Sequence, residues 1–151
     1  MIGASVTDQR RQASDRALRL AARDPLARAL GIECTEAGPG RSVARLTVDD
    51  MHLNFNGACH GGVIFALADT AFGLASNSHG MIAVGIDAHI TYHVAAQRGD
   101  TLMATACEIS RARRIAVYRI DVTRNDGALV SSFTGTVDVT TRPHDGGPVR
   151  H

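Results

Sequence analysis

Residues 63–75 read VIFALADTAFGLA, an apolar stretch of helical length that begins directly after His60-Gly61-Gly62. Asp69 is its only charged residue. An ionised carboxylate costs several kcal/mol to bury unless it gains partners, and no basic residue stands beside it in this stretch. Asp69 is therefore the first candidate for chemistry. The alternative is a structural role, in which Asp69 caps a neighbouring loop or faces solvent.

The glycine pair supplies a complement to this carboxylate. Unpaired backbone N–H groups at a helix start carry partial positive charge and can hold an anionic oxygen. At about 1.5 Å rise per residue, the amide of Gly61 lies roughly 12 Å along the axis from Asp69, too far for one carbonyl to contact both. If both groups act on one substrate, they come from different copies of the chain. The sequence thus predicts a homodimer with shared sites, unless Gly61-Gly62 only forms a tight turn.

The composition favours a single domain and argues against several kinds of partner. The chain has 151 residues, of which 44% are hydrophobic, enough for one ordinary core. Aromatic residues make up 4%, Trp is absent and the formal net charge is +1, which disfavours nucleic-acid binding. The N-terminal segment lacks the apolar core of a signal peptide, and residues 63–75 are too few to span a bilayer. We expect a cytoplasmic protein that does not bind membranes.

Cysteines and histidines indicate no metal site. Cys34, Cys59 and Cys107 are odd in number and lack C-x-x-C spacing, which argues against a disulfide framework or structural zinc. A nucleophilic pair of Cys59 and His60 is disfavoured because adjacent side chains rarely face each other. His89 and His93 share one face of a predicted strand, but without a third ligand they are better interpreted as surface or interface residues. No metal or redox cofactor is expected.

Apolar periodicity predicts the other elements. Residues 14–30 have helical spacing, interrupted at Asp24-Pro25, where proline suits the first turn of a second short helix. Strands are expected over residues 43–48, 82–94, 101–110, 115–124 and 129–140. Because the central helix is apolar on nearly every side, we expect an α+β fold in which a curved antiparallel sheet wraps around it. We divide the chain into an N-terminal helical extension (1–24), a main domain (25–141) and a flexible tail (142–151).

The segment HLNFNGACHGGVIFALADTAFGLASNSHG, residues 52–80, resembles the hotdog-fold acyl-CoA thioesterases of the PaaI-like group, which is associated with phenylacetate catabolism. The resemblance implies a hotdog fold, dimers whose sheets run together, and often homotetramers. It also implies hydrolysis of an acyl-CoA thioester without a cofactor. Phenylacetyl-CoA and its ring-hydroxylated forms are the implied substrates, although a short- or medium-chain acyl-CoA fits the same residues.

The resemblance also implies roles for single residues. The position matching Asp69 is the nucleophile or the general base, and the position matching Gly61 donates its backbone N–H to the thioester carbonyl from the partner chain. Asn54 matches a residue that orients the attacking water or the carboxylate, and His60 matches a supporting residue. Partial burial should raise the pKa of Asp69, whereas a hydrogen bond from Asn54 or from the Thr70 hydroxyl would oppose the rise.

Further positions are candidates for contacts with the substrate. Gly62 and Thr70 flank the proposed chemistry, and Asn77 either caps the helix or contacts CoA, with capping slightly favoured. Three arginines between two strands offer charge-assisted hydrogen bonds to the CoA phosphates, unless they form a solvated hairpin turn: Arg111, Arg113 and Arg114.

One loop departs from the family pattern. The stretch TYHVAAQRGDTL, residues 91–102, lacks the Arg-Pro pair that is common in the family after this strand, so the resemblance does not predict the shape of this loop.

Two alternative functions are considered. An enoyl-CoA hydratase or dehydratase of the same fold would use His60 and Asp69 on one substrate. A non-catalytic acyl-CoA sensor is the second alternative, although the chain shows no convincing DNA-binding segment.

Overall fold

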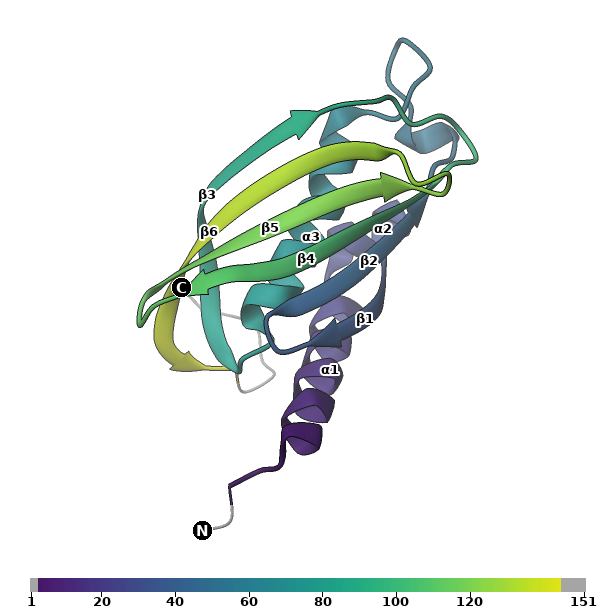
Figure 1. The fold of residues 1–151 in the computed structure, drawn as a ribbon. Helices are drawn as coiled ribbons and strands as arrows, with labels where there is room; N and C mark the ends of the chain where they lie inside the picture. Colours follow the sequence, from purple (N-terminus) through teal and green to yellow (C-terminus); the bar gives the residue numbers. More distant parts are fainter. Residues whose placement is uncertain (1–2, 145–151) are drawn as a thin grey trace.

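A six-stranded antiparallel sheet curves around one long helix, α3 (Gly61–Asn77), in the computed structural model, which describes residues 3–144 (Figure 1). The strand order is β1-β2-β4-β5-β6-β3. The strands are β1 (Glu33–Gly38), β2 (Arg41–Thr47), β3 (Met81–Tyr92), β4 (Thr101–Arg111), β5 (Ile115–Arg124) and β6 (Leu129–Pro143). Two helices precede the sheet, α1 (Val6–Ala22) and α2 (Pro25–Leu30). The predicted α+β hotdog architecture is confirmed.

Small apolar residues let α3 approach the sheet closely. Ala68, Ala71 and Ala75 are fully buried. Phe72 lies 5.7 Å from Phe133, measured between ring centroids. A Cβ at Gly135 would lie 2.6 Å from the Phe72 ring, so this position of β6 must be glycine. Helix and sheet are therefore fitted to each other, and the helix has one fixed orientation against the sheet.

The N-terminal helices follow local signals. Ser5 and Asp8 form a capping box at the start of α1. Asp24 caps α2, with Pro25 at its first turn. The break expected at Asp24-Pro25 is thus confirmed, although α1 begins earlier than predicted, at Val6. In Figure 1, α1 extends past one end of the sheet.

The sequence prediction omitted one strand and ended another too early. The first strand, β1, was missed because its residues do not alternate between buried and exposed, and its pairing with β2 shifts at a bulge between Cys34 and Glu36. β6 continues through Pro143, so Arg142 belongs to a strand and not to a tail. The remainder of the predicted tail, residues 145–151, lies outside the described residues.

Strand β3 forms an edge of the sheet and carries exposed apolar side chains. Val84, Ile86 and Tyr92 are 50%, 58% and 48% exposed. Along its other edge β3 pairs with no strand within residues 3–144. A long apolar strand edge of this kind is a ready template for pairing with another chain.

Over residues 3–144, no helix combines the length and apolarity needed to cross a membrane.

Candidate active site

Asp69 lies on a face of α3 that opens into a pocket of about 510 Å³, which we call the Asp69 pocket. The volume is within the usual range for small-ligand sites. Leu20, Asp24 and Leu26 line it from the N-terminal helices. The other described lining residues come from α3, from the start of β3 and from the position directly after β6: Ala66, Thr70, Gly73, Leu74, Asn77, residues 82–85 and His144.

The environment of Asp69 makes its carboxyl harder to ionise. Asp69 is an exposed residue in the single chain and lines the pocket, and neighbouring atoms partly bury its carboxyl. This burial raises the pKa of Asp69, and the negative charge of Asp24 raises it further. The rise predicted from burial is therefore found. The hydrogen bond from Thr70 that would oppose it is not, because the Thr70 hydroxyl donates to the carbonyl of Ala66 at 2.7 Å.

Gly61 lines a second pocket at the start of α3, which we call the Gly61 pocket. Asn54, Cys59 and Tyr92 also line it, and it shares no lining residue with the Asp69 pocket. As the first residue of the helix, Gly61 has no helical acceptor for its N–H, and no other described residue accepts a hydrogen bond from it. The Tyr92 hydroxyl donates to the Gly61 carbonyl at 2.9 Å. The Gly61 N–H is thus free to bind an anionic oxygen.

His60 and Gly62 are engaged in forming the helix start. His60 is the N-cap of α3, and its Nδ1 accepts the N–H of Gly62 at 2.8 Å. In the neutral ring this places the proton on Nε2. The contribution of His60 is therefore to hold the first turn, and the Gly62 N–H is already bonded, unlike that of Gly61.

Asn54 organises the loop before the helix. Its Oδ1 accepts the N–H groups of Asn56 at 2.9 Å and Ala58 at 3.2 Å. The backbone N–H of Asn54 donates to the Ala58 carbonyl. Within residues 3–144 its Nδ2 group has no hydrogen-bond partner, so this amide can donate to a ligand in the Gly61 pocket.

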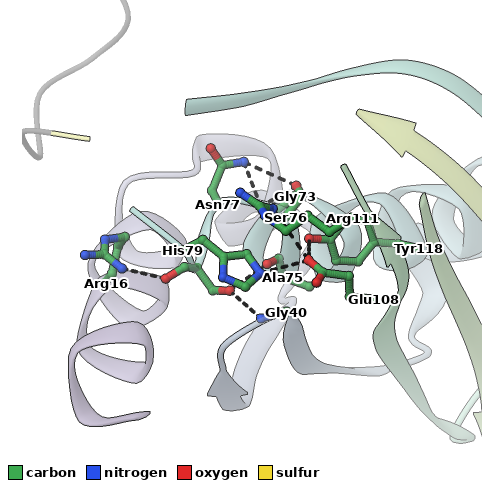
Figure 2. Close-up of polar contacts among 11 residues, drawn as sticks. Arg16, Gly40, Gly73, Ala75, Ser76, Asn77, His79, Glu108, Arg111 and Tyr118 are labelled. Carbon is green, nitrogen blue, oxygen red and sulfur yellow. Dashed lines mark hydrogen bonds and ion pairs between the residues drawn. The ribbon is translucent and has the colours of Figure 1, made fainter. Parts of the chain in front are cut away.

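Asn77 joins the end of α3 to β3. Its amide nitrogen donates to the carbonyl of Gly73 (Figure 2). It also donates to the carbonyl of Ala83, and its Oδ1 accepts the N–H of Ala83 at 2.9 Å. His144 Nε2 lies 2.7 Å from the same oxygen. Since both amide groups of Asn77 are occupied by protein, the geometry favours the capping interpretation over contact with CoA.

Two of the three candidate arginines already hold carboxylates. Arg111 pairs with Glu108, which also accepts hydrogen bonds from His79 and Tyr118 (Figure 2). These bonds outweigh the effect of burial and lower the pKa of Glu108.

Arg114 binds both oxygens of Asp138. Arg113 forms no ion pair with another described residue, and it lines a surface pocket together with Arg111 and Arg114. Arg113 is thus the arginine of this group best able to bind a phosphate.

Several residues of the two pockets were missed from the sequence. Asp24 was recognised as a helix boundary, yet nothing local indicated that its charge would act on Asp69. Tyr92 and His144 reach their pockets through the pairing of β3 with β6, which places Tyr92 opposite Ser131 and Met81 opposite Pro143. Only a correct prediction of the sheet order would have found them. No group of three or more His, Cys, Asp or Glu suited to a metal ion occurs among the described residues.

Comparison with known proteins gives consistent matches. The family described as the thioesterase superfamily matches residues 56–131. Acyl-coenzyme A thioesterase PaaI of Escherichia coli is 38% identical over 74% of this chain and 80% of its own length. Human acyl-coenzyme A thioesterase 13 is 30% identical over 69% of this chain and 77% of its own.

Solved structures agree with these matches. The E. coli PaaI protein from the phenylacetic acid degradation operon superposes with a TM-score of 0.87 at 33% identity, covering 89% of this chain and 98% of that one. A Streptococcus mutans protein bound to acetyl CoA gives a TM-score of 0.71 at 31% identity, covering 74% and 90%. With relatives of this identity and coverage, and with the same sheet closed around α3, the chain belongs to the PaaI-like acyl-CoA thioesterases of the hotdog-fold thioesterase superfamily.

Proposed function

We propose that this protein hydrolyses the thioester of an aryl or medium-chain acyl-CoA such as phenylacetyl-CoA, in sites that two copies of the chain share. The observation that carries this proposal is the position of the two pockets along β3. The Asp69 pocket uses residues 82–85 near the start of β3, whereas the Gly61 pocket uses Tyr92 and residues 93–95 at its end.

Pairing of two β3 edges would bring the pockets together. In an antiparallel pair related by a two-fold axis, the start of one strand lies beside the end of the other. Each Asp69 pocket then adjoins the Gly61 pocket of the partner subunit. The exposed Val84 and Ile86 of the β3 edge favour such a contact. Two such dimers would form the homotetramer that the resemblance implies.

The chemistry follows from the two groups. The Gly61 N–H binds the thioester oxygen as it becomes an oxyanion, which a preorganised donor stabilises by a few kcal/mol. Asp69 either takes a proton from water, which adds to the carbonyl carbon, or attacks that carbon itself to give a mixed anhydride that water then cleaves. In both routes the C–S bond breaks and the CoA thiolate takes up a proton. The raised pKa of Asp69 makes the carboxylate a stronger base.

The substrate class is tested by following thiol release from phenylacetyl-, 4-hydroxyphenylacetyl-, acetyl-, octanoyl- and crotonyl-CoA. We expect free CoA in a one-to-one ratio with the carboxylic acid, fastest for the aryl and octanoyl thioesters. Hydration of crotonyl-CoA without free thiol would instead favour the hydratase alternative. Tight binding without turnover of any thioester would favour the acyl-CoA sensor.

The arginine pocket suggests where the CoA phosphates bind. We expect Arg113→Ala to raise KM for acyl-CoA several-fold, because a charge-assisted phosphate contact is lost. The corresponding N-acetylcysteamine thioester, which carries no phosphate, should keep its KM. Arg10→Ala, which removes an arginine from α1, is the control. An equal rise for both thioesters would contradict phosphate binding by Arg113.

The charge of Asp24 gives a prediction for pH dependence. Asn caps helices as well as Asp does, so Asp24→Asn should keep α2 while removing the charge that raises the pKa of Asp69. A lower pKa leaves Asp69 ionised at lower pH. We therefore expect the acid limb of the kcat/KM profile to move to lower pH. Asp8→Asn, at the start of α1, should leave the limb in place, and a shift to higher pH in Asp24→Asn would contradict the argument.

A further inference from the structure

Gly73 is a glycine for which the fold gives no reason. It lies within α3, one turn after Asp69 on the same face, and it lines the Asp69 pocket. Its φ lies outside the left-handed region, and a Cβ at this position would meet nothing within 4 Å. Gly135 differs, because a Cβ there would strike the ring of Phe72. Neither the backbone nor packing requires glycine at position 73.

Keeping this glycine has a cost. Glycine in a helix interior destabilises a protein by about 0.5–1 kcal/mol relative to alanine. The backbone carbonyl of Gly73 accepts a hydrogen bond from Asn77, which any residue would preserve. The missing side chain leaves space in the pocket beside the candidate catalytic carboxylate, and this space is the feature that can offset the cost.

The walls of the pocket indicate which part of a substrate fills that space. Its apolar wall includes Leu20, Leu26, Leu74, Ile82 and Val84. Among the described residues that line the pocket, Asp24 and Asp69 carry carboxylates, and none is an arginine. Such a surface repels the phosphates of CoA and accepts a neutral apolar group. Gly73 thus lies where the acyl group of a thioester held at Asp69 would extend.

We propose that Gly73 determines acyl specificity: the missing side chain leaves room in the Asp69 pocket for a bulky apolar acyl group, aryl or medium-chain. This inference rests on the proposed function, because it takes the thioester carbon to lie at Asp69. In an apolar pocket, one methylene group changes the ratio of kcat/KM between two substrates by about 10–200-fold, and we expect an effect of this size at Gly73.

The test uses Gly73→Ala and Gly73→Leu, with Ala22→Leu as the matched control. Ala22 lies at the end of α1, is exposed, and does not line the pocket, so the control places a leucine elsewhere on a helix. We expect both Gly73 variants to have a higher Tm than the wild type, which excludes misfolding as the cause of any loss. We expect kcat/KM to fall with acyl size, least for acetyl-CoA and about 10–200-fold for octanoyl- and phenylacetyl-CoA in Gly73→Leu.

Binding of non-hydrolysable S-alkyl-CoA thioethers separates this inference from the proposed function. We expect the wild type to bind S-octyl-CoA more tightly than S-methyl-CoA, and Gly73→Leu to lose this preference. Loss of the preference in a protein that hydrolyses no thioester would support the pocket assignment and refute the hydrolase proposal. Hydrolysis with an unchanged preference, or an equal loss for every acyl group, would overturn the role of Gly73.

Discussion

Asp69→Asn is expected to lower kcat for thioester hydrolysis by about 10²–10⁴-fold, the usual contribution of a positioned general base. The amide has the shape of the carboxyl but can neither take a proton from water nor attack a carbonyl carbon. Because the loss concerns the chemical step, KM should change little. Thiol release at saturating phenylacetyl-CoA measures the effect, and Asp15→Asn on the exposed side of α1 is the matched control.

The same substitution should leave the fold intact and slightly stabilise it. The folded-state pKa of Asp69 is raised above its ordinary value of 3.8, so the ionised carboxylate disfavours the folded state at neutral pH. Asn removes this cost, and Tm at pH 7 should equal or exceed that of the wild type. The difference in Tm between the variant and the wild type should vanish as the pH falls below 3.8, where the carboxyl is protonated in the folded and the unfolded state.

The catalytic assignment itself is tested by turnover. Near-normal turnover by Asp69→Ala would refute it.

The central helix and its two chemical groups could be predicted because their signals are local. An apolar stretch with one carboxylate, preceded by His60-Gly61-Gly62, indicates a buried helix and its start without reference to the rest of the chain. The structure adds that His60 Nδ1 accepts a hydrogen bond from the Gly62 N–H, whereas the Gly61 N–H stays free. A sequence pattern marks a helix start, but it does not decide which amide of that start is already bonded.

The neighbours of Asp69 could not be predicted because tertiary contacts bring them together. Asp24 is forty-five positions earlier in the chain, and its effect on the Asp69 pKa depends on how α2 docks on α3. The arginines show the same limit. Arg114 forms a cluster with its neighbours in the sequence, whereas its partner Asp138 is two strands further on. Whether a charge is free to bind a ligand depends on such distant partners.

Gly61→Pro is expected to lower kcat by about 10²–10³-fold, the effect of losing one oxyanion donor. Proline is well tolerated here, because the first helical residue has no intrahelical use for its N–H. The preceding His60 already has φ −61° and ψ 133°, as a residue before proline requires. The matched control is Gly61→Ala, which keeps the N–H. Its Cβ meets the same neighbour as that of proline, the Tyr92 ring at 3.3 Å. Equal losses in the two variants would show that this contact, and not the donor, is responsible.

Mixing the two inactive variants tests whether the groups belong to one shared site. In a heterodimer of Asp69→Asn and Gly61→Pro chains, one site lacks both groups and the other has both. After denaturation and refolding of an equal mixture, half of the dimers are mixed, so about a quarter of the wild-type activity should return if the dimer has two-fold symmetry. If each chain instead carried a complete site of its own, no activity would return. A sedimentation measurement on each refolded sample establishes that the chains have paired, so that absence of activity then counts against the shared site.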